Sequence, residues 1–96
     1  MISTYSRGSV TLTVERGAGA DLLAFTITRT APLTADEIRR VNAELSDYST
    51  ADGAKLVQSP ATGAWEVRAN GIALASDHGD HTSELQWTVP AGNPAT

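Results

Sequence analysis

The stretch Ala31–Tyr48, APLTADEIRRVNAELSDY, decides where a helix begins in this chain and which face of it is buried. Thr34 is a favourable N-cap residue, and Glu37, three positions later, completes a capping box. The apolar positions that follow recur at helical spacing, at Ile38, Val41, Leu45 and Tyr48. Because such positions form one stripe on a helix, the sequence predicts a single amphipathic helix that packs against a sheet.

Two alternating stretches precede the predicted helix. In residues 10–15 and 23–28, apolar side chains alternate with threonine and other small or polar residues, which is the period of a strand with one buried face. The connecting segment RGAGAD leads into a strand rather than into a helix, so its glycines favour a turn over a phosphate-binding loop. We expect the two strands to form an antiparallel hairpin.

A second hairpin is predicted after the helix, in the stretch AWEVRANGIALAS. Asn70 and Gly71 form the dipeptide most typical of a two-residue turn between strands. With these two as the turn, Ala69 pairs with Ile72, and Val67 pairs with Leu74. This register places four apolar side chains on the buried face of the sheet: Trp65, Val67, Ile72 and Leu74.

The last predicted strand is ELQWTVP, residues 84–90, with Leu85, Trp87 and Val89 facing inward. The following segment, 91–96, has the composition of a flexible tail. We therefore predict an α+β fold: a single small domain over residues 1–90, with a mainly antiparallel sheet of about five strands. The expected order is β-β-α-β-β-β, with the amphipathic helix packed on one face of the sheet.

Composition excludes several classes of protein. The chain has 96 residues, 41% hydrophobic and 19% charged, with no cysteine and a net charge of −4. It lacks thiolates for disulfides or metal sites, and its seven basic residues are scattered, which disfavours direct nucleic-acid binding. We find neither an apolar run of roughly eighteen residues nor a recognisable secretion signal. The expected location is the cytoplasm or the inside of a virion, with no membrane contact and no cofactor.

Both histidines lie in one short stretch, SDHGDHTS, residues 76–83. His78, Asp80 and His81 match three of the four positions in the His-x-His-x-Asp-His pattern, so the stretch resembles the metal-binding motif of metallo-β-lactamase-like hydrolases. That resemblance implies a divalent metal bound by these three residues. It covers only six residues, Ser76 occupies the first ligand position, and the chain has no third histidine. The family's fold is also more than twice as long as this chain.

The alternative interpretation of the same stretch is a surface connection between two strands. In it, Asp77 and Asp80 accept hydrogen bonds from turn amides, Gly79 adopts a positive φ, and the histidines are solvated. We favour this interpretation because a short loop provides neither a walled cavity nor the supporting contacts of a catalytic metal. Histidines beside acids would still give the loop a charge that changes near neutral pH.

We find no other catalytic constellation, such as a serine in a Gly-x-Ser-x-Gly turn. The sequence therefore predicts a small non-enzymatic module that binds a protein partner. One form of such a module is an inhibitor of a host system encoded by a phage or mobile element, as anti-CRISPR proteins are. The alternative is a structural or self-assembling subunit, such as a virion decoration or tail component, and a homo-oligomer would fit it. The least favoured function is a metal-dependent hydrolase. The expected partner contacts are Asp77, His78, Asp80, His81, Arg39 and Arg40.

The arginine pair has a competing interpretation. Asp36 and Glu44 each lie four residues from Arg40, the spacing at which opposite charges meet on a helix. Arg39 and Arg40 are therefore also consistent with an ordinary solvated helix face.

Overall fold

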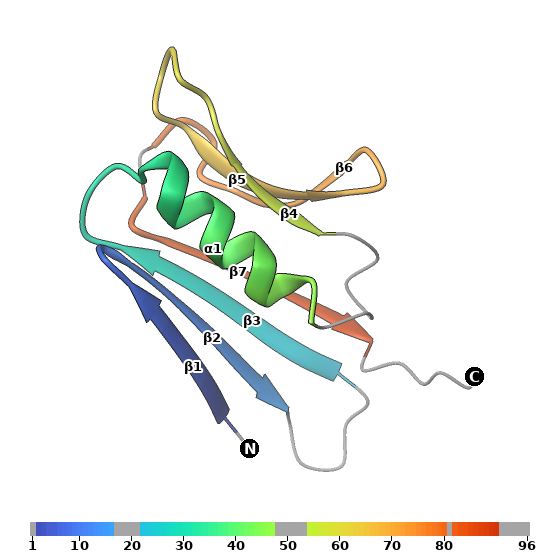
Figure 1. The fold of residues 1–96 in the computed structure, drawn as a ribbon. Helices are drawn as coiled ribbons and strands as arrows, with labels where there is room; N and C mark the ends of the chain where they lie inside the picture. Colours follow the sequence, from blue (N-terminus) through green and yellow to red (C-terminus); the bar gives the residue numbers. More distant parts are fainter. Residues whose placement is uncertain (1, 17–21, 48–53, 81, 91–96) are drawn as a thin grey trace.

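A computed structural model describes residues 2–16, 22–47, 54–80 and 82–90 of the chain. The fold is α+β, as predicted, and its helix lies between the third and fourth strands (Figure 1). The elements are β1 (Ile2–Arg7), β2 (Val10–Arg16), β3 (Leu22–Arg29), α1 (Ala35–Leu45), β4 (Lys55–Gln58), β5 (Trp65–Ala69), β6 (Ile72–Ser76) and β7 (Glu84–Pro90).

The described strands form two antiparallel sheets rather than the one sheet expected. The larger has the order β1-β2-β3-β7, and the smaller has the order β4-β5-β6. Helix α1 contacts β1 and β4, while β6 contacts β7. Together, α1 and the smaller sheet therefore cover one face of the larger sheet (Figure 1).

Strand β1 was not expected from the sequence. Its residues are mostly exposed on both faces, and only Tyr5 packs partly against the core. An edge strand of this kind has no apolar alternation, so periodicity does not reveal it. Its partner β2 fixes its position through a ladder that runs from Ile2 opposite Glu15 to Arg7 opposite Val10.

One hydrophobic core joins both sheets and the helix. The inward positions of β2 and β3 agree with the predicted alternation, and the rings of Phe25 and Trp87 stack across β3 and β7, with centroids 5.1 Å apart. Trp65 and Trp87 are both buried, as predicted. The burial of large apolar side chains is the main favourable contribution to the folding free energy of such a domain.

The second hairpin turns at Asn70 and Gly71, as predicted, and both residues have positive φ. Its register differs from the expected one, because a bulge leaves Leu74 without an opposite residue and pairs Val67 with Ala75. Ile72, expected in the core, is 64% exposed beside the turn. The bulge shifts the pairing only beyond Ala73, and local turn rules do not predict it, whereas Ile72 keeps its predicted partner Ala69.

Helix α1 begins at the predicted cap. The hydroxyl of Thr34 accepts a hydrogen bond from the amide of Glu37, and the Glu37 carboxylate accepts one from the amide of Thr34. The predicted apolar stripe is present in part, since Val41 and Leu45 are buried and Ile38 packs at the edge of the core. Tyr48 and the predicted tail 91–96 lie outside the described residues.

Candidate functional site

The histidine stretch is organised by the buried carboxylate of Asp77, which is 2% exposed. Its Oδ2 accepts a hydrogen bond from the amide of Trp65 at 3.2 Å, and its Oδ1 accepts one from the amide of Gly79 at 2.8 Å. Gly79 has a φ of 82°, as the turn interpretation predicts. Asp77 therefore holds the loop against β5 and has little surface to offer a partner.

Two further residues of the loop, His78 and Asp80, are exposed. His78 is exposed, has a φ of 54°, and donates its amide to the Ser76 hydroxyl. Asp80 is exposed and donates its amide to the carbonyl of Asp77. His81 lies outside the described residues. Within the described part of the chain, no three His, Cys, Asp or Glu side chains are grouped so that they could hold a metal ion.

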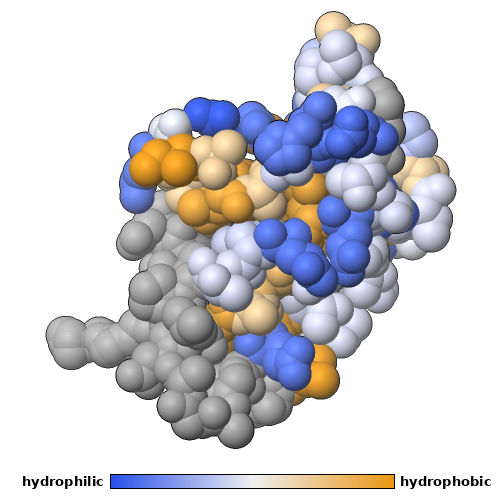
Figure 2. All heavy atoms as spheres, turned by 180° about the vertical axis from the view of Figure 1, so that it is seen from behind, coloured by the Kyte–Doolittle hydropathy of each residue, from blue (hydrophilic) through white to orange (hydrophobic). Residues whose placement is uncertain are grey.

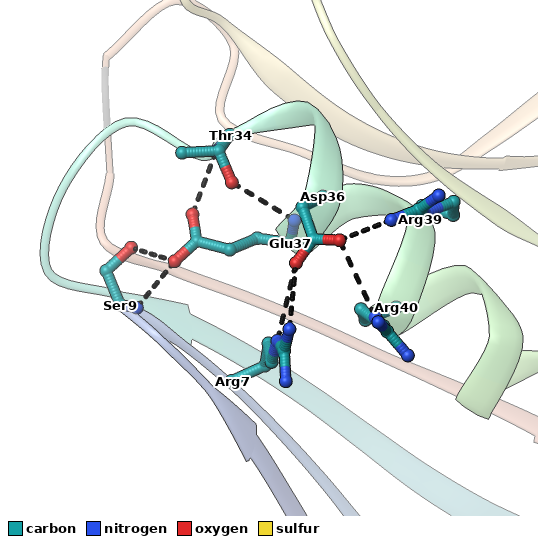
Figure 3. A network of polar contacts seen from close by, with 7 residues as sticks. All are labelled: Arg7, Ser9, Thr34, Asp36, Glu37, Arg39 and Arg40. Carbon is teal, nitrogen blue, oxygen red and sulfur yellow. Dashed lines mark hydrogen bonds and ion pairs between the residues drawn. The ribbon is translucent and has the colours of Figure 1, made fainter.

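The arginine pair belongs to an ion cluster around Asp36 on the exposed face of α1 (Figure 3). Arg39 and Arg40 both reach Oδ1 of Asp36, and Arg7 of β1 reaches Oδ2 at 3.2 Å. The hydrogen bond from Arg39, together with Arg7 and the charge of Arg40, lowers the pKa of Asp36. The predicted contact residues Arg39 and Arg40 thus share one carboxylate, and such exposed pairs contribute little to stability.

Glu37 has a second role, which the sequence did not predict. Besides capping α1, its Oε2 accepts hydrogen bonds from the Ser9 amide at 2.7 Å and from the Ser9 hydroxyl at 3.1 Å (Figure 3). It therefore fastens the turn between β1 and β2 to the helix. Gly8 in that turn has a φ of 61°, which side chains with a Cβ rarely adopt, and a Cβ there would collide with Oε2 of Glu37. The turn accordingly requires glycine at this position.

Two surface cavities lie near the histidine loop. The first, of about 480 Å³, is lined by Val57, Gln58, Ser59, Ala64, Trp65, Glu66, Ser76, Asp77, His78 and Gly79. Two of the predicted contact residues, Asp77 and His78, are among the residues that line it. The second, of about 350 Å³, is lined by Arg29, Thr30, Ala31, Pro32 and Ser83.

The edges of the two sheets differ in how they are covered. The side-chain amide of Asn42 pairs with β4, accepting from the Leu56 amide at 2.6 Å and donating to the Leu56 carbonyl at 3.1 Å. Strands β6 and β7 lie beside each other. Among the described residues, β1 pairs only with β2, so its outer edge has no strand beside it.

The geometry of the first turn identifies the polar groups at that free edge. Gly8 and Ser9 form a two-residue turn between Arg7 and Val10. The pair that flanks such a turn exchanges both hydrogen bonds, and the bonded pairs then alternate along the ladder. The amides and carbonyls of Ser3, Tyr5 and Arg7 therefore point toward β2, and those of Ile2, Thr4 and Ser6 point away from the sheet.

The large exposed apolar side chains of the described residues do not share one element. Three large apolar residues are exposed among those described, on three different strands: Ile2, Val57 and Ile72. On the face seen in Figure 2, some hydrophobic residues adjoin one another, and hydrophilic residues surround them. In the described part of the chain, no helix has the length and apolar character needed to cross a bilayer.

Comparison with known proteins found no relative: no family model, no curated protein and no solved structure matches this chain.

Proposed function

We propose that this protein is a non-enzymatic binding module that attaches a partner protein by pairing its own strand β1 with a strand of the partner. The observation that carries the proposal is the free edge of β1, where the amides and carbonyls of Ile2, Thr4 and Ser6 point outward. Added strands bind mainly through such main-chain hydrogen bonds.

Features of β1 itself support the proposal. Proteins commonly protect exposed edges with lysine, proline or a bulge. Strand β1 has neither lysine nor proline, and its pairing with β2 is regular over its whole length. Ile2, which is 62% exposed, adds an apolar side chain that a partner strand can cover. The turn at the end of β1 is held by Glu37, so the edge is presented by a fixed hairpin.

The test is capture from a host lysate on immobilised protein, followed by mass spectrometry, with two variants at one position. Thr4→Pro removes an outward amide and leaves the bonds to β2 in place, whereas Thr4→Ala retains that amide. We expect a specific protein to be retained by the wild type and by T4A and lost with T4P. Retention by T4P equal to that of the wild type would contradict the use of this edge.

The proposal includes a second step, in which the partner is a component of a host system and the protein inhibits it. The identity of the captured protein tests it. Addition of the purified module to that component should reduce the component's activity, and T4P should not.

Self-assembly is the second candidate, and the sequence of β1 favours it. If two copies of β1 pair antiparallel about Thr4, Ile2 lies opposite Ser6, and Ser3 lies opposite Tyr5. No like charges meet in this register, and three pairs of outward residues form hydrogen bonds. Light scattering separates the candidates: a dimer that T4P converts to a monomer supports self-assembly, and a monomer at high concentration contradicts it.

A further inference from the structure

The second cavity contains an arginine that forms no ion pair with any described residue. Arg29, at the end of β3, lies over the ring of Trp65, with its Cζ atom 4.4 Å from the ring centroid. It forms part of the wall of the cavity of about 350 Å³, together with Thr30 and Ser83. Its guanidinium thus sits where the ends of both sheets meet.

The other arginines with described side chains have acidic partners: Arg7, Arg39 and Arg40 contact Asp36, and Arg68 contacts Glu66. Arg29 forms no ion pair with a described residue, although it is half-buried, and its Nη1 is buried without a hydrogen-bond partner. A buried, charged donor without a partner is unfavourable. An anion at this cavity would supply the missing charge.

The rest of the cavity wall fits an oxyanion. The hydroxyls of Thr30 and Ser83 form no hydrogen bond to a described group and are available as donors. Ala31 and Pro32 provide an apolar surface for the group that carries the anion. The contact with the Trp65 ring restrains the guanidinium, so less side-chain freedom is lost when Arg29 binds an anion.

We propose that Arg29, with Thr30 and Ser83, forms a binding site for an oxyanion, either a carboxylate or a phosphate group. The guanidinium provides charge and paired donors, and the hydroxyls complete the coordination of the oxygens. This site is separate from the β1 edge and does not depend on the strand-binding function.

The test is a titration followed by NMR of the Arg29 side-chain Nε–Hε group and of the amides of Thr30 and Ser83. Three probes are used separately: sodium phosphate, sodium acetate, and sodium chloride as a control for ionic strength. We expect saturable shifts with phosphate or acetate and only small linear shifts with chloride. The oxyanion that binds with the higher affinity identifies the preferred head group. Linear, chloride-like responses to both would overturn the proposal.

Variants test the residues. Arg29→Gln is expected to weaken binding at least about tenfold, because a charge-assisted hydrogen bond is lost. Ser83→Ala, at an exposed position that leaves the Trp65 stack in place, is expected to weaken it about threefold. Lys55→Gln, which removes an exposed cation from β4, should leave affinity unchanged. Equal loss in K55Q would show a general charge effect and would contradict the site, as would full affinity in both R29Q and S83A.

Discussion

The carboxylate of Glu37 accepts hydrogen bonds from two segments that are far apart in the sequence. One oxygen binds the amide of Thr34 at the start of α1, and the other binds the amide and hydroxyl of Ser9. The side chain is 8% exposed, so these bonds are largely shielded from water. At the residue scale, this single group joins the helix to the first hairpin.

Replacing the charge is therefore expected to destabilise the fold. Glu37→Gln preserves the shape of the side chain but removes the negative charge and one acceptor oxygen. The NH₂ group of the new glutamine would then face donors of Thr34 or Ser9. We expect a loss of roughly 1–3 kcal/mol in the free energy of unfolding, the usual range for a buried polar group that loses its partner. Urea denaturation at neutral pH measures it. Glu44→Gln on the same helix, whose side chain has no hydrogen bond to a described group, is the control and should change little.

The pH dependence of stability is a second test of the hydrogen bonds to Glu37. Backbone hydrogen bonds from Thr34 and then Ser9 lower the pKa of Glu37 below its ordinary value of 4.5. The unfolded chain therefore binds more protons in acid, and stability must fall as the pH falls. The contribution is complete above pH 4.5 and is lost as the pH drops through the lower folded pKa. Urea midpoints measured through this range should fall more steeply for the wild type than for E37Q. Parallel curves would contradict the assignment.

The two roles of Glu37 differ in how far the sequence reveals them. The capping box joins residues three apart, so a local rule predicts it. The contact with Ser9 joins residues 28 apart and depends on how the hairpin packs on the helix. The same limit applies to Arg29 and Trp65, whose stack brings together the ends of different sheets. Sequence spacing gives no information about such pairs.

At the scale of elements, α1 completes the smaller sheet through one side chain. Asn42 gives β4 an acceptor and a donor at Leu56, as a neighbouring strand would. Asn42→Ala leaves that amide and carbonyl unpaired beside the core, and we expect a loss of about 2–4 kcal/mol. Hydrogen exchange should show faster exchange of the Leu56 amide. Ala43→Gln, at an exposed position of the same helix, is the control, and equal protection of Leu56 in N42A would contradict the role.

The sequence predicted those helices, strands and turns in which burial produces a periodic apolar pattern or the backbone requires particular residues. The alternation of β2 and β3, the cap at Thr34 and the Asn70–Gly71 turn all belong to this group. Strand β1 was missed because exposure removes the alternation on which prediction depends. The bulge at Leu74 was missed because the Asn-Gly turn rule fixes the pairing beside the turn and not farther along the strands. Of the residues predicted to contact a partner, Asp77 is a buried anchor of the loop, because its carboxylate binds amides that are distant in the sequence or formed by the turn itself; the other contacts remain predictions.

At the scale of the whole molecule, the two sheets depend on one core. Trp65 belongs to the smaller sheet and Trp87 to the larger, and both belong to the same buried cluster. The Trp65 indole also donates a hydrogen bond at 3.1 Å to the carbonyl of Thr82, just before β7. Neither sheet can therefore lose its packing without exposing apolar surface of the other, so separate unfolding of one sheet is costly.

This arrangement predicts one cooperative unfolding transition, and the two tryptophans allow each sheet to be observed separately. In Trp87→Phe, fluorescence reports the smaller sheet, and in Trp65→Phe it reports the larger, while far-UV circular dichroism reports the whole chain in both. Each variant will be less stable than the wild type, because a smaller ring leaves space in the core. Within each variant, however, the fluorescence and dichroism midpoints in urea should coincide. If the smaller sheet unfolded at a lower urea concentration, the fluorescence and dichroism midpoints of W87F would differ. That result would show that the shared core does not couple the two sheets.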